Sequence, residues 1–211
     1  MGSGDLLAGD RGPQTQVTIT KGFWIGRTLV TQAQYQAVTG GNPSRFKGET
    51  LPAEQVSWDD AMAFCQKLAK VDPLAVHLPP TYGFTLPTEA QWEYACRAGT
   101  TGDGHDEMNA LSWNSQNSEG TTHPVGLKQA NAWGLYDMHG NVWEWCFDWY
   151  GKYPGGEESN PTGPATGTGR VDRGGSWFSG PVHCSSTHRG FDAPGVRFSN
   201  VGFRLALAPS P

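Results

Sequence analysis

Residues 86–100 read LPTEAQWEYACRAGT and contain the start, body and end of one helix. Thr88 stands at the N-cap position, and Gln91 three residues later completes a capping box, in which each side chain accepts a bond from the other residue's backbone N–H. Gly99 suits the position just past the last turn, where a left-handed backbone favours glycine. Local chemistry alone therefore predicts a helix between Thr88 and Gly99.

A second helix is predicted ahead of this one, from residue 58 onward. Ser57 stands at its N-cap, and Asp60 three residues later completes the capping box. The apolar residues that follow recur every three to four positions, which predicts one buried face. Thr31 caps a shorter helix, and Gly40 ends it.

The strand patterns are short and lie between these helices. Residues 16–19 alternate between polar and apolar side chains, and an apolar run at 23–25 follows a Lys-Gly turn, so we expect an opening hairpin. A further strand is predicted at 84–86. The chain also contains 29 glycines and 15 prolines, which favour turns. We expect a flexible N-terminus at residues 1–13, followed by a single loop-rich α+β domain over residues 14–211.

Charge and hydropathy exclude two classes of partner. The 211-residue chain has a formal net charge of -5 and no run of Lys or Arg, so no nucleic-acid partner is expected. No apolar stretch approaches the length of about 18 residues that a membrane span needs, so no membrane insertion is expected. The start of the chain lacks the basic and apolar regions of a secretory signal, which favours a cytoplasmic location. The four cysteines are widely spaced, which fits reduced thiols better than a disulfide scaffold. This spacing also favours a cytoplasmic location for the chain, whose cysteines are Cys65, Cys96, Cys146 and Cys184.

Two more segments are long enough to be specific. Residues 134–150 read GLYDMHGNVWEWCFDWY, and residues 170–206 begin with RVDRGGSW and end with VGFRLA. Together with residues 86–100 they resemble the formylglycine-generating enzyme family, also called sulfatase-modifying factor domains, a branch of the C-type lectin fold. The resemblance covers residues 14–206. It implies the fold of that family, a small twisted antiparallel sheet with two main helices and many loops.

Resemblance to this family does not assign a reaction, because the family includes enzymes as well as pure binding proteins. Its oxidases use two cysteines, five residues apart, to bind copper(I), which prefers soft thiolate ligands. The corresponding positions here are Ser179 and Cys184. Because a hydroxyl cannot replace a thiolate, we expect no copper site, no catalytic residue, and a buried thiol at Cys184. The alternative is an enzyme or accessory domain that uses Cys184 with His183 and His188 nearby.

The resemblance also implies a candidate calcium site. Members of the family can hold calcium near the GNVWEW loop, where Asn141 and Glu144 would supply the oxygen donors that it prefers. Asn141 equally suits a turn after Gly140, and Glu144 suits a buried hydrogen bond. We expect no required cofactor, with a structural calcium ion at these two residues as the alternative.

The segment between the GGSW and GFR motifs departs from the family pattern. In relatives of the usual type this segment is rich in asparagine and arginine. Here both ends are intact, but asparagine is retained at only one of thirteen positions. These positions are Phe178, Ser179, Gly180, Val182, His183, His188, Gly190, Phe191, Asp192, Val196, Phe198, Ser199 and Asn200.

This pattern resembles the variable protein of a diversity-generating retroelement, in which adenines of a template repeat are randomised during reverse transcription. Randomised adenines in AAC or AAT codons cannot give codons for Lys, Glu, Gln, Met or Trp. None of these five residue types occurs from Phe178 to Gly202. If the residues at the thirteen positions followed the composition of the chain, all thirteen would lack these five types roughly one time in twenty. The resemblance implies a variable region at about 173–204.

These observations predict a ligand-binding protein that displays a diversified surface on a C-type lectin scaffold. Phe178, Phe191 and Phe198, rimmed by Ser, His and Asp residues, suit a face over residues 178–200 that binds a protein or surface ligand. Aromatic side chains provide a large contact area at low entropic cost. The competing interpretation is that strand alternation turns these phenylalanines into the core.

Overall fold

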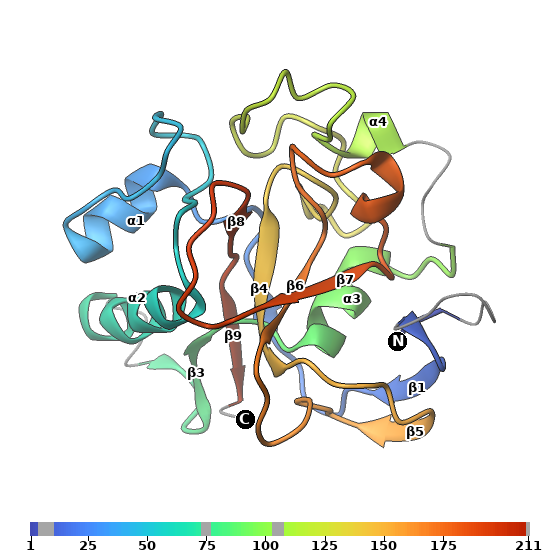
Figure 1. The fold of residues 1–211 in the computed structure, drawn as a ribbon. Helices are drawn as coiled ribbons and strands as arrows, with labels where there is room; N and C mark the ends of the chain where they lie inside the picture. The colour runs from blue at the N-terminus through green and yellow to red at the C-terminus, as the bar shows by residue number, and fades with distance from the viewer. Residues whose placement is uncertain (4–10, 73–76, 103–107, 210–211) are drawn as a thin grey trace.

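The computed structural model describes residues 1–3, 11–72, 77–102 and 108–209. Its largest sheet has four strands in the order β7-β6-β4-β8 (Figure 1). Strand β6 is antiparallel to both of its neighbours, whereas β4 and β8 run parallel. The two edge strands, β7 and β8, both lie within the predicted variable region at 173–204. The strands are β4 (Trp143–Trp149), β6 (Arg170–Arg173), β7 (Arg189–Asp192) and β8 (Val201–Gly202).

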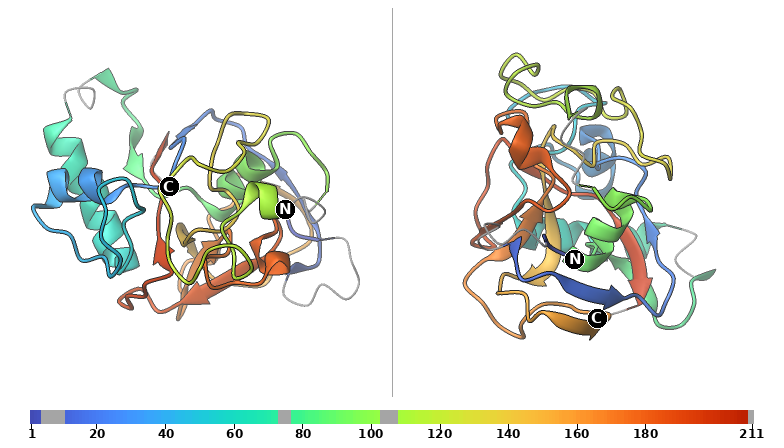
Figure 2. Two further views of the ribbon diagram at one scale, coloured as in Figure 1. Left: turned by 90° about the horizontal axis from the view of Figure 1, so that it is seen from above. Right: turned by 90° about the vertical axis from the view of Figure 1, so that its right-hand side faces the viewer.

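Two smaller sheets account for the remaining strands of the described residues. Strands β2 (Trp24–Ile25) and β3 (Tyr82–Thr85) each pair antiparallel with β9 (Ala206–Pro209). Strand β1 (Thr15–Thr18) pairs in parallel with β5 (Gly156–Ser159), and Figure 2 shows the two strands side by side. The expected opening hairpin is therefore wrong, because β1 and β2 belong to different sheets.

Asn160, directly after β5, explains why β1 pairs with a distant strand. The backbone N–H of Thr20 donates to Oδ1 of Asn160 at 2.9 Å, and Nδ2 of Asn160 donates to Oγ1 of Thr20 at 2.7 Å. The N–H of Asn160 also donates to the carbonyl of Thr18 at 2.9 Å. These bonds continue the β1–β5 pairing beyond the strands. Alternation along a segment predicts a strand, but it does not identify the partner.

The predicted helices are present, with all three capping boxes at Thr31, Ser57 and Thr88. Gly99 follows the C-cap residue of the third helix and has a φ of 90°, as expected. No helix among the described residues has both the length and the apolar character needed to cross a bilayer. The helices are α1 (Gln32–Thr39), α2 (Trp58–Val71), α3 (Glu89–Arg97), the short α4 (Met108–Leu111) and a 3-10 turn at Pro181–Cys184.

Strand β4 divides the core into two clusters. Successive side chains of a strand point to opposite faces, so Trp145 and Cys146 face opposite ways. Trp145 packs in a cluster with Phe64 of α2, whereas Cys146 packs in a second cluster with Trp92 of α3. Figure 1 accordingly shows α2 and α3 on opposite sides of this strand. The α+β class, the two main helices and the loop-rich remainder agree with the sequence analysis.

The first residues of the chain lie against α3. The N–H of Gly2 donates to both carboxylate oxygens of Glu93, at 3.1 and 3.2 Å. Residues 4–10, which belong to the N-terminus expected to be flexible, lie outside the described part of the chain.

Candidate ligand-binding face

Three buried ion pairs hold the predicted variable region to the rest of the molecule. They lie at its beginning, middle and end, and their side chains are at most 3% exposed. A buried charge without its partner costs several kcal/mol, on the order of 3–5, so each pair fixes one point of the segment. The pairs are Arg173 with Glu93, Arg189 with Glu89 and Arg204 with Glu144, each with a shortest N–O distance of 2.5 Å.

Arg173 and Arg204 belong to the RVDRGGSW and VGFRLA motifs at the ends of the segment, but their glutamate partners and the Arg189–Glu89 pair were not predicted from the sequence. Glu89 and Glu93 lie four residues apart, on one face of α3, and that face is buried. The spacing was visible in the sequence, since residues four apart on a helix are neighbours. What the sequence did not show is that Arg173 and Arg189 come from distant strands to neutralise this face.

Two glycines allow the chain to turn after β6. Gly174 and Gly175 have φ values of 93° and 73°, which disfavour other residue types. A Cβ on Gly175 would lie 2.7 Å from Sγ of Cys184 and 2.8 Å from the carbonyl oxygen of His183. The backbone therefore passes against the 3-10 turn at a distance that only glycine permits.

Exposure divides the segment into two groups of residues. Arg173, Ser176, Cys184 and Arg189, which hold the segment to the scaffold, are buried, whereas none of the thirteen predicted variable positions is buried. The interpretation that the phenylalanines form core is therefore wrong. Large apolar side chains at these positions are strongly exposed: Phe178 by 71%, Val182 by 60%, Phe191 by 51% and Phe198 by 44%.

Contacts within the segment bring its two ends together. Nε1 of Trp177 donates to the carbonyl oxygen of Ser199 at 3.0 Å, and the Trp177 ring lies 5.5 Å from that of Phe178. The rings of His183 and His188 lie 4.6 Å apart. Figure 1 shows the segment between β6 and β8, in orange and red, running across the front of the molecule. The exposed positions thus share one side of the scaffold.

The tryptophans of the GNVWEW and GGSW motifs, Trp143, Trp145 and Trp177, differ in their burial. Trp145 is fully buried, and its Nε1 donates to the carbonyl oxygen of Val56 at 2.9 Å. Trp143 and Trp177 are half-buried. Trp143 packs against the cluster around Trp145 and lies 5.7 Å from the ring of His188. These two tryptophans join the core to the exposed face.

A hollow of about 340 Å³ opens on this face, where β6 and β7 meet the end of β8. Trp143, Asp172 and Val201 contribute the part of its wall that lies outside the thirteen positions. Five of the thirteen positions form the rest of the wall: Gly190, Phe191, Asp192, Phe198 and Asn200.

The thiol of Cys184 lies in the interior of the protein. The thiol is fully buried and donates to the carbonyl oxygen of Gly180 at 3.9 Å, and burial raises its pKa to about 12. Such a thiol stays protonated near neutral pH, whereas a nucleophile or copper ligand must be a thiolate. Oγ of Ser179, at the position of the second family cysteine, accepts a bond from the N–H of Ser176 at 3.1 Å. The expectation of a buried thiol at Cys184 is confirmed.

Asn141 and Glu144, the two residues of the alternative calcium site, both form hydrogen bonds within the protein. Oδ1 of Asn141 accepts the N–H of His123 at 3.1 Å, and its Nδ2 donates to the carbonyl oxygen of His123 at 3.0 Å. Both carboxylate oxygens of Glu144 accept bonds from Arg204, at 2.5 and 2.8 Å. Calcium needs about six to eight oxygen ligands. In the described ranges, no group of three His, Cys, Asp or Glu side chains is placed to hold a metal ion.

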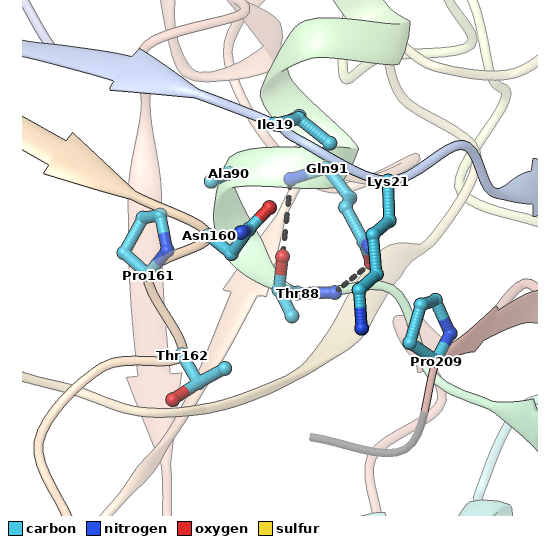
Figure 3. A pocket seen from close by; sticks show the side chains of 9 residues that line it. All are labelled: Ile19, Lys21, Thr88, Ala90, Gln91, Asn160, Pro161, Thr162 and Pro209. Atoms are coloured by element: carbon cyan, nitrogen blue, oxygen red, sulfur yellow. Dashed lines mark hydrogen bonds between the residues drawn. The ribbon is translucent and has the colours of Figure 1, made fainter. Parts of the chain in front are cut away.

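A second hollow, of about 250 Å³, lies near the start of α3 (Figure 3). Thr88 and Gln91 in its wall already bond to each other through the capping box, shown by the dashed lines. Lys21 is the only charged residue among those that line it, and none of the thirteen variable positions does so. This hollow therefore offers no cluster of functional groups comparable to the first.

The loop-rich scaffold and the buried frame around residues 173–204 define a domain of the formylglycine-generating enzyme type. The chain matches the Sulfatase-modifying factor enzyme 1-like domain over residues 1–209 and belongs to this family. It is 32% identical to the formylglycine-generating enzyme of Mus musculus over 203 residues, which cover 86% of this chain and 51% of that enzyme. The chain thus spans about half the length of the mouse enzyme.

Two solved structures share the fold over most of their length. Treponema denticola variable protein 1 has a TM-score of 0.81 at 36% identity, and the match covers 89% of this chain and 84% of that one. PvdO from Pseudomonas aeruginosa has a TM-score of 0.84 at 29% identity, with 98% and 89% covered. The predicted fold class, the C-type lectin fold of this family, is confirmed. The predicted resemblance to a variable protein is confirmed as well.

Proposed function

We propose that this protein is a non-catalytic ligand-binding protein whose residues 178–200 form a diversified binding face. The observation that carries the proposal is the division of residues 173–204 by exposure. All thirteen positions predicted to vary are at least partly exposed, while Arg173, Ser176, Cys184 and Arg189, which hold the segment to the scaffold, are buried. Replacing side chains at most of these positions changes the surface alone, as a diversified binding protein requires, and Val196 is the position that also packs against the core.

The exposed aromatic side chains support a protein or surface ligand as the target. Phe178, Phe191 and Phe198 are exposed at the face, and buried ion pairs hold the backbone beneath them. Interface hot spots are enriched in aromatic residues that become buried on binding. A rigid scaffold keeps the entropic cost of binding low. The similarity to Treponema denticola variable protein 1 supports the same class of function.

The DNA that flanks the gene tests this proposal. We expect a near-copy of the codons for residues 173–204, with AAC or AAT at the thirteen positions, beside a reverse transcriptase gene. Absence of such a repeat from the genome would overturn the diversified-surface proposal.

The alternative function is an enzyme that uses Cys184, and membership of a family that contains oxidases supports it. This alternative predicts stoichiometric copper or iron in the purified protein, or a Cys184 thiol that titrates well below its ordinary pKa. Metal analysis and a thiol titration distinguish the two functions. We also propose a cytoplasmic location, which the four buried, free cysteines support.

A further inference from the structure

Asp172 forms part of the floor of the 340 Å³ hollow. It lies in β6, directly opposite Gly190 in β7, and is only 3% exposed. Within the part of the chain that the structure describes, no donor forms a hydrogen bond with its carboxylate. Buried carboxylates are normally hydrogen-bonded or paired with a cation, because removal from water is costly. This one instead faces a hollow that is open to solvent.

Among the described residues, no Lys or Arg side chain forms an ion pair with this carboxylate. Burial, and after it the negative charge of Asp192 of β7 in the same hollow, raises the pKa of Asp172 well above its ordinary value, although Arg173 acts in the opposite direction. Arg173, next in β6, is paired with Glu93 and also lies 3.3 Å from Glu89. The ring of His188, before β7, lies 5.7 Å from that of Trp143 and 4.6 Å from that of His183.

Three other arginines nearby are engaged elsewhere. Arg189, directly before Gly190 in β7, forms an ion pair with Glu89. Arg170, opposite Asp192 in the β6–β7 pairing, donates to the carbonyl oxygen of Phe147 at 2.6 Å, and its guanidinium lies 3.7 Å from the Trp58 ring centroid. Arg197 forms an ion pair with Asp60. No Lys or Arg lines the hollow.

We propose that this hollow binds a cationic side chain of the target, the ammonium group of a lysine or the guanidinium group of an arginine, with Asp172 as its anchor. The inference rests on the proposed function and adds the chemical class that the face accepts. Asp172 would accept charge-assisted hydrogen bonds from the cation. The rings of Trp143 and Phe198 in the wall suit cation–π contact with the same group.

The anchor differs from the rest of the face because it lies outside the variable region. Asp172 precedes residues 173–204, so diversification would alter the rim of the hollow and retain the carboxylate. Gly190 keeps the carboxylate accessible, because a Cβ at this position would overlap Oδ1 of Asp172. Any other residue at 190 must displace the anchor. Gly190 is therefore the variable position whose change affects the hollow most directly.

The test is a titration of the ¹⁵N-labelled full chain by NMR, with N-acetyl-lysine methylamide and N-acetyl-arginine methylamide as probes. N-acetyl-norleucine methylamide, which has a similar apolar stem and no charge, is the matched control. We expect either cationic probe to shift the amide signals of Gly190, Phe191 and Val201 with a Kd on the order of 1–10 mM. Asp172→Asn keeps the shape of the side chain and should weaken binding at least tenfold. Asp59→Asn removes the same charge from α2 and should leave the Kd unchanged.

Gly190→Ala provides a second test that retains the charge. The added Cβ displaces the Asp172 carboxylate, so binding of the cationic probes should fall as in Asp172→Asn. Binding should also strengthen as the pH rises, because a cation binds the ionised form of Asp172. Equal binding of the norleucine probe, no binding of the cationic probes, or an unchanged Kd in Asp172→Asn would each overturn the inference.

The flanking-DNA test of the proposed function is independent of these titrations. If a template repeat is found but the cationic probes do not bind, only the proposed role of Asp172 is overturned. Cation binding without a template repeat would leave the hollow as the site of a protein that is not diversified.

Discussion

Arg189 and Glu89 lie 100 residues apart in the sequence and form two charge-assisted hydrogen bonds in the interior. Nε of Arg189 donates to Oε1 at 2.8 Å, and Nη2 donates to Oε2 at 2.5 Å. The hydroxyl of Tyr153 donates to the same Oε1 at 2.9 Å. This pair ties β7, which includes three of the thirteen positions, to the helix whose capping box was visible in the sequence. The exposed face therefore has a rigid support.

Replacing Arg189 with methionine should destabilise the protein strongly. The change leaves the Glu89 carboxylate buried without its main partner, which typically costs about 3–5 kcal/mol. Urea unfolding followed by tryptophan fluorescence measures the loss. Arg197→Ala is the control, because the Arg197–Asp60 pair is exposed by 51% and 31% and should contribute less than about 1 kcal/mol. Equal losses in the two variants would contradict a structural role specific to the buried pair.

Alanine at Phe178 or Phe198 should leave the free energy of unfolding within about 0.5 kcal/mol of wild type, as for most surface changes. Both rings are exposed, by 71% and 44%. Phe203 is 1% exposed and packs in the core with Phe64, so Phe203→Ala should cost about 3–5 kcal/mol. Thermal unfolding of the three variants checks this. A large fall in Tm for Phe178→Ala or Phe198→Ala would place those rings in the core.

Local chemistry predicted the elements of the fold better than it predicted their partners. The boxes at Thr31, Ser57 and Thr88 involve residues three apart, so the sequence displays both members of each interaction. The β1–β5 pairing depends on Thr20 and Asn160, which are 140 residues apart, and no pattern in the sequence links them.

At the candidate site too, the sequence predicted local features but not the contacts between distant segments. The sequence predicted thirteen variable positions within residues 178–200, and the structure shows that none of them is buried. Asp172 was missed, because a single aspartate in a strand carries no signal of its own. Its significance depends on the cross-strand position of Gly190 and on the absence of a cation in the wall of the hollow, and both are properties of the folded chain.

The native protein should not react with iodoacetamide at pH 8. All four cysteines are buried, and burial raises the pKa of Cys65, Cys96 and Cys184 to about 12. The pKa of Cys146 is raised as well. Mass spectrometry should find no modification in buffer and four in guanidinium chloride, since unfolding exposes every thiol. Rapid modification of native Cys184 alone would instead favour the enzymatic alternative.

Replacing Asp148 with asparagine should stabilise the protein above pH 7. Burial and the nearby Glu89 raise the pKa of Asp148 to about 8, whereas an aspartate in the unfolded chain titrates near 3.9. Between these values the folded state holds a proton that the unfolded state has lost, so stability falls as the pH rises from about 4 to about 8. Asparagine cannot ionise and can still accept the N–H of Glu89, which Oδ2 of Asp148 accepts at 2.8 Å. In urea unfolding from pH 4 to pH 9, the free energy of unfolding of Asp148→Asn should therefore exceed that of wild type by an amount that grows with pH. Glu54, whose pKa is raised to about 7, is present in both proteins and does not affect this difference. A constant difference across this range would contradict the raised pKa of Asp148.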